Sequence, residues 1–128
     1  MASIQRFEDI QAWQKARVLV REIYQLSAQG RFSRDFGLRD QICRAAVSSM
    51  SHIAEGFIRS SNKDFAHFLD IARASAAEVQ SLLYVALDVG YMDTTEFERL
   101  YSLGDETILL IGSFASYLRR GSLPKDLS

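Results

Sequence analysis

Apolar residues recur along the chain at the three- and four-residue spacing of helices that bury one face. The pattern predicts amphipathic helices at about 9–28, 36–58, 62–89 and 94–120. Gly30 and Gly90 suit the ends of two of these helices, and Ser61 and Asp93 suit the starts of two others. Connections of about three to seven residues allow only antiparallel neighbours. We therefore expect an all-α, antiparallel up-down-up-down four-helix bundle, with residues 1–128 as a single domain.

The second and fourth predicted helices carry more apolar positions than a bundle core requires. A core-facing stripe spans somewhat over ~100° of the helical wheel. In these two helices, apolar residues such as Met50 and Phe114 spread over about 180°. In the first helix, Tyr24 falls on the same side as the core residues. Because large apolar patches mark sites of association, we expect the chain to self-associate.

Several short motifs resemble those of one bacterial family. They are FEDI at 7–10, WQKA at 13–16, FGL at 36–38, RAAVS at 44–48, IAEGF at 53–57 and GYM at 90–92. In this combination and order they resemble the bacterial four-helix bundle family, also called the S23 or 23S rRNA intervening-sequence protein family. The resemblance extends from residue 7 to about 118. Some members of this family are encoded within intervening sequences of 23S rRNA genes.

The resemblance also implies an assembly and its partners. Relatives with the same bundle serve diversity-generating retroelements, where they form five-fold rings and bind nucleic acid and a reverse transcriptase. The expected partners are therefore the chain itself, as a homopentamer, RNA or DNA, and a partner protein. No catalytic residue or cofactor is implied. The chain departs from the family pattern at His52, where asparagine is usual, and at Ser49 and Met50, where Ile-Pro is usual.

One face of the second predicted helix carries a narrow polar stripe beside its broad apolar arc. Its members are Gln41, Arg44, Ser48, His52 and Glu55, which fall within about 80° of the helical wheel. One interpretation is a hydrogen-bonded network at a contact between helices or subunits, with Arg44 available to a carboxylate or phosphate. The alternatives are a solvated helix face and a ligand site.

Charge is unevenly distributed, although the formal net charge is only −1. Residues 1–75 hold eleven basic and eight acidic side chains, whereas residues 76–118 hold one basic and seven acidic. Twelve of the fifteen bases are arginine, whose planar guanidinium matches phosphate. The candidate nucleic-acid contacts are Arg17, Arg21, Arg39, Arg59 and Lys63. The alternative, which the net charge of −1 favours, is that these bases are solvated or pair with the acidic fourth helix. The aromatic residues also do not alternate with the bases, as they would in a surface that stacks nucleic-acid bases.

Few residues indicate catalysis or a metal centre. Di-iron bundles use Glu-x-x-His on two helices and a glutamate from each of the others, whereas His52-x-x-Glu55 has the reverse order. Cys43 and His52 lie on opposite sides of one helix and cannot form a nucleophile–base pair. No phosphate-binding loop or nucleophile elbow occurs. We expect no enzyme, cofactor or metal; the alternative is an enzyme or metal-binding protein with its site in the bundle core.

The apolar runs of the chain are much too short to span a bilayer. The segment MASIQRFEDI lacks the apolar stretch of a secretory signal. A lone cysteine cannot form an internal disulfide, which fits a reducing compartment. The sequence therefore predicts a cytoplasmic, non-enzymatic assembly and binding module without a membrane partner.

Overall fold

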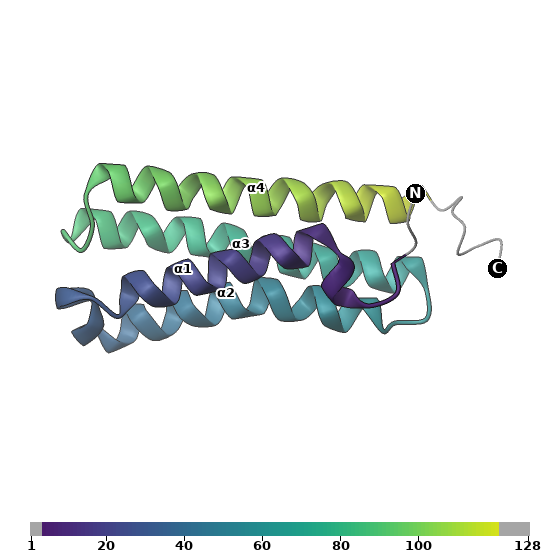
Figure 1. Cartoon of the computed structure of the whole chain (residues 1–128), viewed down its shortest axis with the longest axis horizontal. Coiled ribbons are helices and arrows are strands. Elements are labelled where there is room, and N and C mark those ends of the chain that lie inside the picture. Colours follow the sequence, from purple (N-terminus) through teal and green to yellow (C-terminus); the bar gives the residue numbers. More distant parts are fainter. Residues whose placement is uncertain (1–3, 121–128) are drawn as a thin grey trace.

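The computed structural model describes residues 4–120, which fold into four long helices (Figure 1). These are α1 (Gln11–Ser27), α2 (Phe36–Phe57), α3 (Asn62–Asp88) and α4 (Thr94–Arg119). Two short 3-10 helices, η1 (Phe7–Asp9) and η2 (Gly30–Arg34), precede α1 and α2. No strand occurs between residues 4 and 120. The all-α prediction is confirmed, and each long helix begins and ends within two residues of its expected limit.

Successive helices run antiparallel, and each packs against its two neighbours in the cycle from α1 to α4 (Figure 1). This is the up-down-up-down bundle that the sequence predicts. One end of the bundle, here called the η2 end, holds η2 and the α3–α4 turn. The opposite end, here called the α2–α3 end, holds the α2–α3 turn, the start of α1 and the end of α4.

Side chains and glycines at the helix limits explain why the boundaries were predictable. Ser61 and Asp93 each accept a hydrogen bond from the backbone N–H three residues on, at 3.1 and 2.8 Å. Asp35 caps α2 in the same way at 3.2 Å, which the sequence analysis did not anticipate. Gly30 and Gly90 have φ values of 53° and 83°, in the left-handed region that favours glycine. The three side-chain caps satisfy backbone N–H groups that have no partner within the first turn of a helix.

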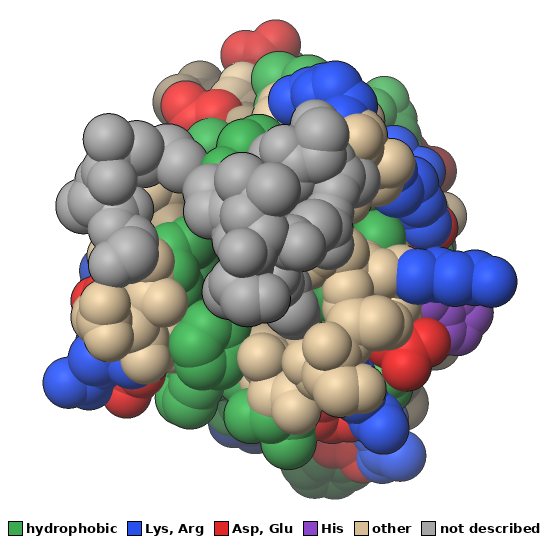
Figure 2. All heavy atoms as spheres, turned by 90° about the vertical axis from the view of Figure 1, so that its right-hand side faces the viewer, with side chains coloured by type: hydrophobic (Ala, Val, Ile, Leu, Met, Phe, Trp, Pro, Cys, Tyr) green, Lys and Arg blue, Asp and Glu red, His purple; other side chains and the backbone are tan. Residues whose placement is uncertain are grey.

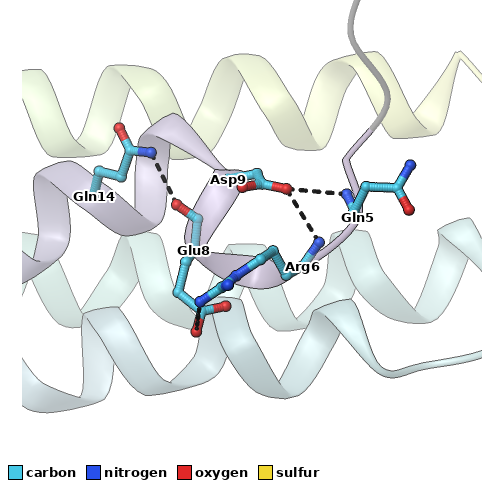
Figure 3. Close-up of polar contacts among 5 residues, drawn as sticks. All are labelled: Gln5, Arg6, Glu8, Asp9 and Gln14. Atoms are coloured by element: carbon cyan, nitrogen blue, oxygen red, sulfur yellow. Dashed lines mark hydrogen bonds and ion pairs between the residues drawn. The ribbon is translucent and has the colours of Figure 1, made fainter.

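Polar contacts among residues 5–14 fix the chain where it leads into α1 (Figure 3). The Asp9 carboxylate accepts hydrogen bonds from the backbone N–H groups of Gln5 and Arg6, at 3.1 and 3.3 Å. The side-chain amide of Gln14 donates to the Glu8 carbonyl oxygen at 2.9 Å, and the Arg6 guanidinium lies 2.7 Å from the Glu8 carboxylate. These contacts hold η1 against the first turn of α1, at the α2–α3 end of the bundle.

The core runs the length of the bundle and draws on all four long helices. Its fully buried large side chains include Leu19, Ile23, Ile42, Ile53, Leu69, Leu83, Leu100 and Ile111. Met50 and Phe114 are half-buried and pack against this core. The broad apolar arcs of α2 and α4 are thus largely used within the chain, because each helix packs against two neighbours and not one. None of the described helices is long and apolar enough to cross a membrane.

Among residues 4–120, exposed large apolar side chains lie at both ends of α2 and on α4, where the sequence predicted them, and also outside these two helices. They are Ile4, Tyr24, Phe36, Ile58, Tyr84, Val85, Val89 and Leu109. Tyr84, Val85 and Val89 lie close together at the carboxyl end of α3 and just beyond it, and only Leu109 belongs to α4. The expectation that Tyr24 faces the core is wrong, because this side chain is 48% exposed at the edge of the apolar stripe of α1.

Candidate functional site

Three members of the polar stripe on α2 face α3 within the same chain. The Ser48 hydroxyl lies 2.9 Å from the Ser75 hydroxyl and 3.0 Å from Nδ1 of His52. The Gln41 side chain donates to the Glu78 carboxylate at 3.5 Å. These contacts pair polar side chains where α2 packs against α3.

The remaining two members of the stripe, Arg44 and Glu55, are exposed on the outer face of α2. Neither forms an ion pair with another residue between positions 4 and 120. Arg44 stands between two surface hollows of about 550 and 420 Å³. Its guanidinium can therefore donate two parallel hydrogen bonds to a phosphate or carboxylate.

His52 is held at the α2–α3 contact by its own helix. Its Nδ1 lies 2.9 Å from the Ser48 carbonyl oxygen. The same nitrogen lies beside the Ser48 hydroxyl, so it donates to the carbonyl oxygen in the tautomer that carries the proton on Nδ1 and accepts from the hydroxyl in the other. The ring stacks on Phe68 with centroids 6.1 Å apart. Cys43 is separate from this group, buried with its sulfur 3.3 Å from the Ser27 hydroxyl.

No cluster of metal ligands forms in the described part of the chain. Between residues 4 and 120, no three side chains of His, Cys, Asp or Glu come together in a way that could hold a metal ion. His67 is exposed and packs edge-on against Phe68 at 6.1 Å, whereas His52 stacks on the same ring. The two histidines therefore share an aromatic neighbour and not a coordination site.

Two of the candidate nucleic-acid contacts lie together on α1. Arg17 and Arg21 are one helical turn apart and exposed. The Arg17 guanidinium lies 5.8 Å from the centre of the Trp13 ring, a cation–π contact that leaves its charge unpaired. No carboxylate of the described chain forms an ion pair with either arginine. Both charges are thus available to an anion.

The other three candidate contacts lie apart from this pair. Arg39 is half-buried near the η2 end, where its guanidinium donates to the Ser33 carbonyl oxygen at 3.3 Å. Arg59 and Lys63 flank the α2–α3 turn, and the Arg59 guanidinium lies 4.5 Å from the centre of the Phe68 ring. Figure 2 looks onto this end and shows basic side chains spread around the rim, interspersed with acidic ones. The structure therefore does not unite the five candidate residues into one basic patch.

Sequence reasoning missed an exposed aromatic pair near the η2 end, Tyr24 and Phe36. Phe36 is the first residue of α2, held by the Asp35 cap. Asp35 also accepts a hydrogen bond from the Tyr91 hydroxyl at 2.8 Å, which raises the pKa of Tyr91 and ties this turn to the α3–α4 turn. The exposure of Tyr24 could have been inferred from the sequence, because this residue follows Arg21 by three positions and so lies on the same face of α1.

The fold and its polar contacts define a four-helix bundle whose unpaired charges lie on the surface. Residues 8–113 match the model of the 23S rRNA-intervening sequence protein family, and the chain belongs to this family. Its fold is similar to the crystal structure of a protein with unknown function from the S23 ribosomal protein family of Bacteroides thetaiotaomicron. That likeness has a TM-score of 0.74 at 22% identity and covers 81% of this chain and 97% of the other. No curated protein matches the chain.

The family resemblance in the sequence motifs is thereby confirmed. The structural neighbour is described as having unknown function, so the comparisons give the family and the fold without an activity. The function has to be argued from the surface of the bundle.

Proposed function

We propose that this chain is a non-enzymatic assembly protein that forms a ring of identical subunits and binds nucleic acid. The observation that carries the proposal is the group of exposed apolar side chains at the carboxyl end of α3, here called the α3 patch and made of Tyr84, Val85 and Val89. These side chains are between 44% and 50% exposed. Covering them with a second copy removes apolar surface from water, at about 25 cal/mol per Å².

Packing around the α3 patch supports a preformed contact surface. The Tyr84 ring lies 4.7 Å from the Phe97 ring and 5.8 Å from the Tyr101 ring, so its position is fixed by α4. A rigid aromatic side chain loses little conformational freedom on binding, which favours association. When one face of a subunit binds a different face of the next, the contacts close into a ring if the rotation between subunits divides a full turn, and otherwise continue as an open filament. The family resemblance makes a homopentamer the expected ring.

The mass of the protein in solution tests this assembly. Light scattering should give several times 14.5 kDa, and about five times for the homopentamer. Val85→Asp should lower that mass, because burying an unpaired charge in an apolar contact is costly. Gln11→Asp is the control, since Gln11 is also exposed but lies at the start of α1. A wild-type mass of 14.5 kDa at every concentration would refute the assembly.

Nucleic-acid binding is supported by the unpaired arginines of α1. Arg17 and Arg21 each place a guanidinium on the outer surface, and a ring repeats the pair in every subunit. Several weak phosphate contacts on one polyanion add up to useful affinity when they engage at the same time. Such contacts position a nucleic acid without reading its sequence. The proposed binding is therefore sequence-independent.

A salt titration with structured RNA and duplex DNA tests the binding. Affinity should fall steeply as salt rises, because each neutralised phosphate releases counterions. Arg17→Gln plus Arg21→Gln should weaken binding and flatten this salt dependence. Gln11→Glu plus Gln29→Glu changes the net charge by the same amount at exposed positions more than one turn from either arginine and should have a much smaller effect. Equal effects of the two double variants would show that Arg17 and Arg21 do not form the binding surface. No binding at low salt would refute the nucleic-acid function.

A further inference from the structure

A groove between α1 and α2 near the η2 end combines exposed aromatic rings with arginines. It has a volume of about 420 Å³, and its lining includes Tyr24, Phe36, Arg39, Asp40 and Arg44. Tyr24 is 48% exposed and Phe36 is 70% exposed. Both rings therefore present a large part of their surface to solvent, whereas Phe32 nearby in the chain is 1% exposed in the core.

The fold fixes the backbone at both exposed aromatic residues, Tyr24 and Phe36. Tyr24 belongs to the regular part of α1, and Phe36 is the first residue of α2, directly after its capping residue Asp35. The backbone N–H of Leu38 and the Tyr91 hydroxyl both donate to the Asp35 carboxylate, so this turn is fixed on two sides. The backbone positions from which the two rings project are thus set by the fold, which lowers the cost of binding a flat partner.

The charges around the groove favour an anion. Arg44 has no ion-pair partner among residues 4–120, and Arg39 donates only to a backbone carbonyl oxygen. Arg21 lies one turn before Tyr24 on α1 and is likewise unpaired and exposed. Asp40 is the one carboxylate of the lining. The lining therefore holds two guanidinium groups against one carboxylate, and Arg21 adds a third positive charge on α1. The groove thus complements phosphate in charge.

We infer that this groove binds unpaired nucleotides of single-stranded RNA or DNA. The bases stack on Tyr24 and Phe36, and the phosphates pair with Arg39 and Arg44. Single strands are favoured over duplex because a base within a duplex has its faces covered by its neighbours, whereas an unpaired base can stack on an aromatic side chain. The inference rests on the proposed nucleic-acid function and names the class of strand and the surface that holds it.

Fluorescence anisotropy with a labelled, unstructured oligonucleotide and a duplex of the same length tests the inference. Phe36→Ala should weaken binding of the single strand by about 5- to 100-fold, the range measured for base–aromatic stacking. It should leave duplex binding nearly unchanged. Phe36→Leu should also weaken single-strand binding, because leucine keeps an apolar side chain but has no ring on which to stack. Asp40→Asn should strengthen binding of the single strand by removing a repulsive charge.

Matched controls separate stacking from general effects. Ile58→Ala removes another exposed apolar side chain, 77% exposed at the far end of α2, and should leave binding unchanged. Circular dichroism should show that every variant keeps its helix content, since Phe36 and Ile58 contribute little to the core. An equal loss of affinity in Phe36→Ala and Ile58→Ala would contradict a specific stacking site.

Three further results overturn the inference in distinguishable ways. If duplex and single strand bind equally and Phe36→Ala affects neither, the groove is not the site, while the proposed nucleic-acid function stands. If neither strand binds even at low salt, the proposed function fails together with the inference. If Phe36→Ala lowers the mass in light scattering but not the affinity, the groove is a contact between copies of the chain.

Discussion

At the scale of single residues, Asp70 of α3 and Arg119 of α4 form a two-point contact, with nitrogen–oxygen distances of 3.1 and 2.5 Å. The hydrogen bonds and positive charge of Arg119 hold the pKa of Asp70 below its ordinary value. The ionised carboxylate therefore stabilises the fold above the pKa of the unfolded chain. That contribution is lost as the pH falls through the lower pKa of the folded state.

We expect Asp70→Asn to lower the free energy of unfolding at neutral pH by about 1 kcal/mol or less, since both side chains of the pair are more than a third exposed. The difference between wild type and variant should shrink as the carboxylate becomes protonated, toward about pH 3. Urea unfolding followed by circular dichroism at the two pH values measures it. A difference that does not change with pH would show that the charge of Asp70 contributes nothing.

At the scale of helices, the closest approach of α2 and α3 depends on Gly56. A Cβ atom added there would lie 2.8 Å from atoms of both Phe65 and Phe68. Gly56→Ala should therefore force the two helices apart and lower the free energy of unfolding by about 1–3 kcal/mol. Gly37→Ala is the matched control on the same helix, because the nearest atom to its added Cβ is 3.9 Å away.

The control should be neutral or slightly stabilising, since alanine favours helix over glycine by up to ~1 kcal/mol. Thermal or urea unfolding of both variants makes the comparison. Equal stability of the Gly56 and Gly37 variants would mean that the α2–α3 contact adjusts without strain.

The helices could be predicted because their signals are local. The periodicity of apolar residues, the caps at Ser61 and Asp93, and the glycines at 30 and 90 all act within a few residues. The 3-10 helices could not be predicted in the same way, because η2 depends on the distant α3–α4 turn, where Arg31 donates to the Gly90 carbonyl oxygen. The width of an apolar arc was also a poor guide to exposure, since neighbouring helices cover most of it.

The candidate site was harder to predict because it depends on which side chains form contacts between different helices. The polar stripe of α2 could be recognised from spacing, but its division into residues that contact α3 and residues that face solvent depends on Ser75 and Glu78. Helical spacing correctly paired Arg17 with Arg21. The groove at Tyr24 and Phe36 could not be found from either helix alone, because it lies between α1 and α2.

At the scale of the whole molecule, the proposed assembly and binding surfaces come from parts of the sequence that differ in charge. The α3 patch lies in the acidic part of the chain, whereas Arg17, Arg21 and the α1–α2 groove belong to the basic part. In the proposed function, the α3 patch contacts a second copy, and the arginines of α1 and of the groove contact a polyanion. In a ring, the first surface would be covered and the second would be repeated, which is how a nearly neutral chain can bind nucleic acid.

The most direct test of this account is sedimentation velocity of the wild-type protein at low salt with a labelled, unstructured oligonucleotide. We expect the label to sediment with a protein species several times heavier than 14.5 kDa. Raising the salt should release the label while the protein assembly remains. A free label beside a 14.5 kDa monomer would contradict both the assembly and the binding.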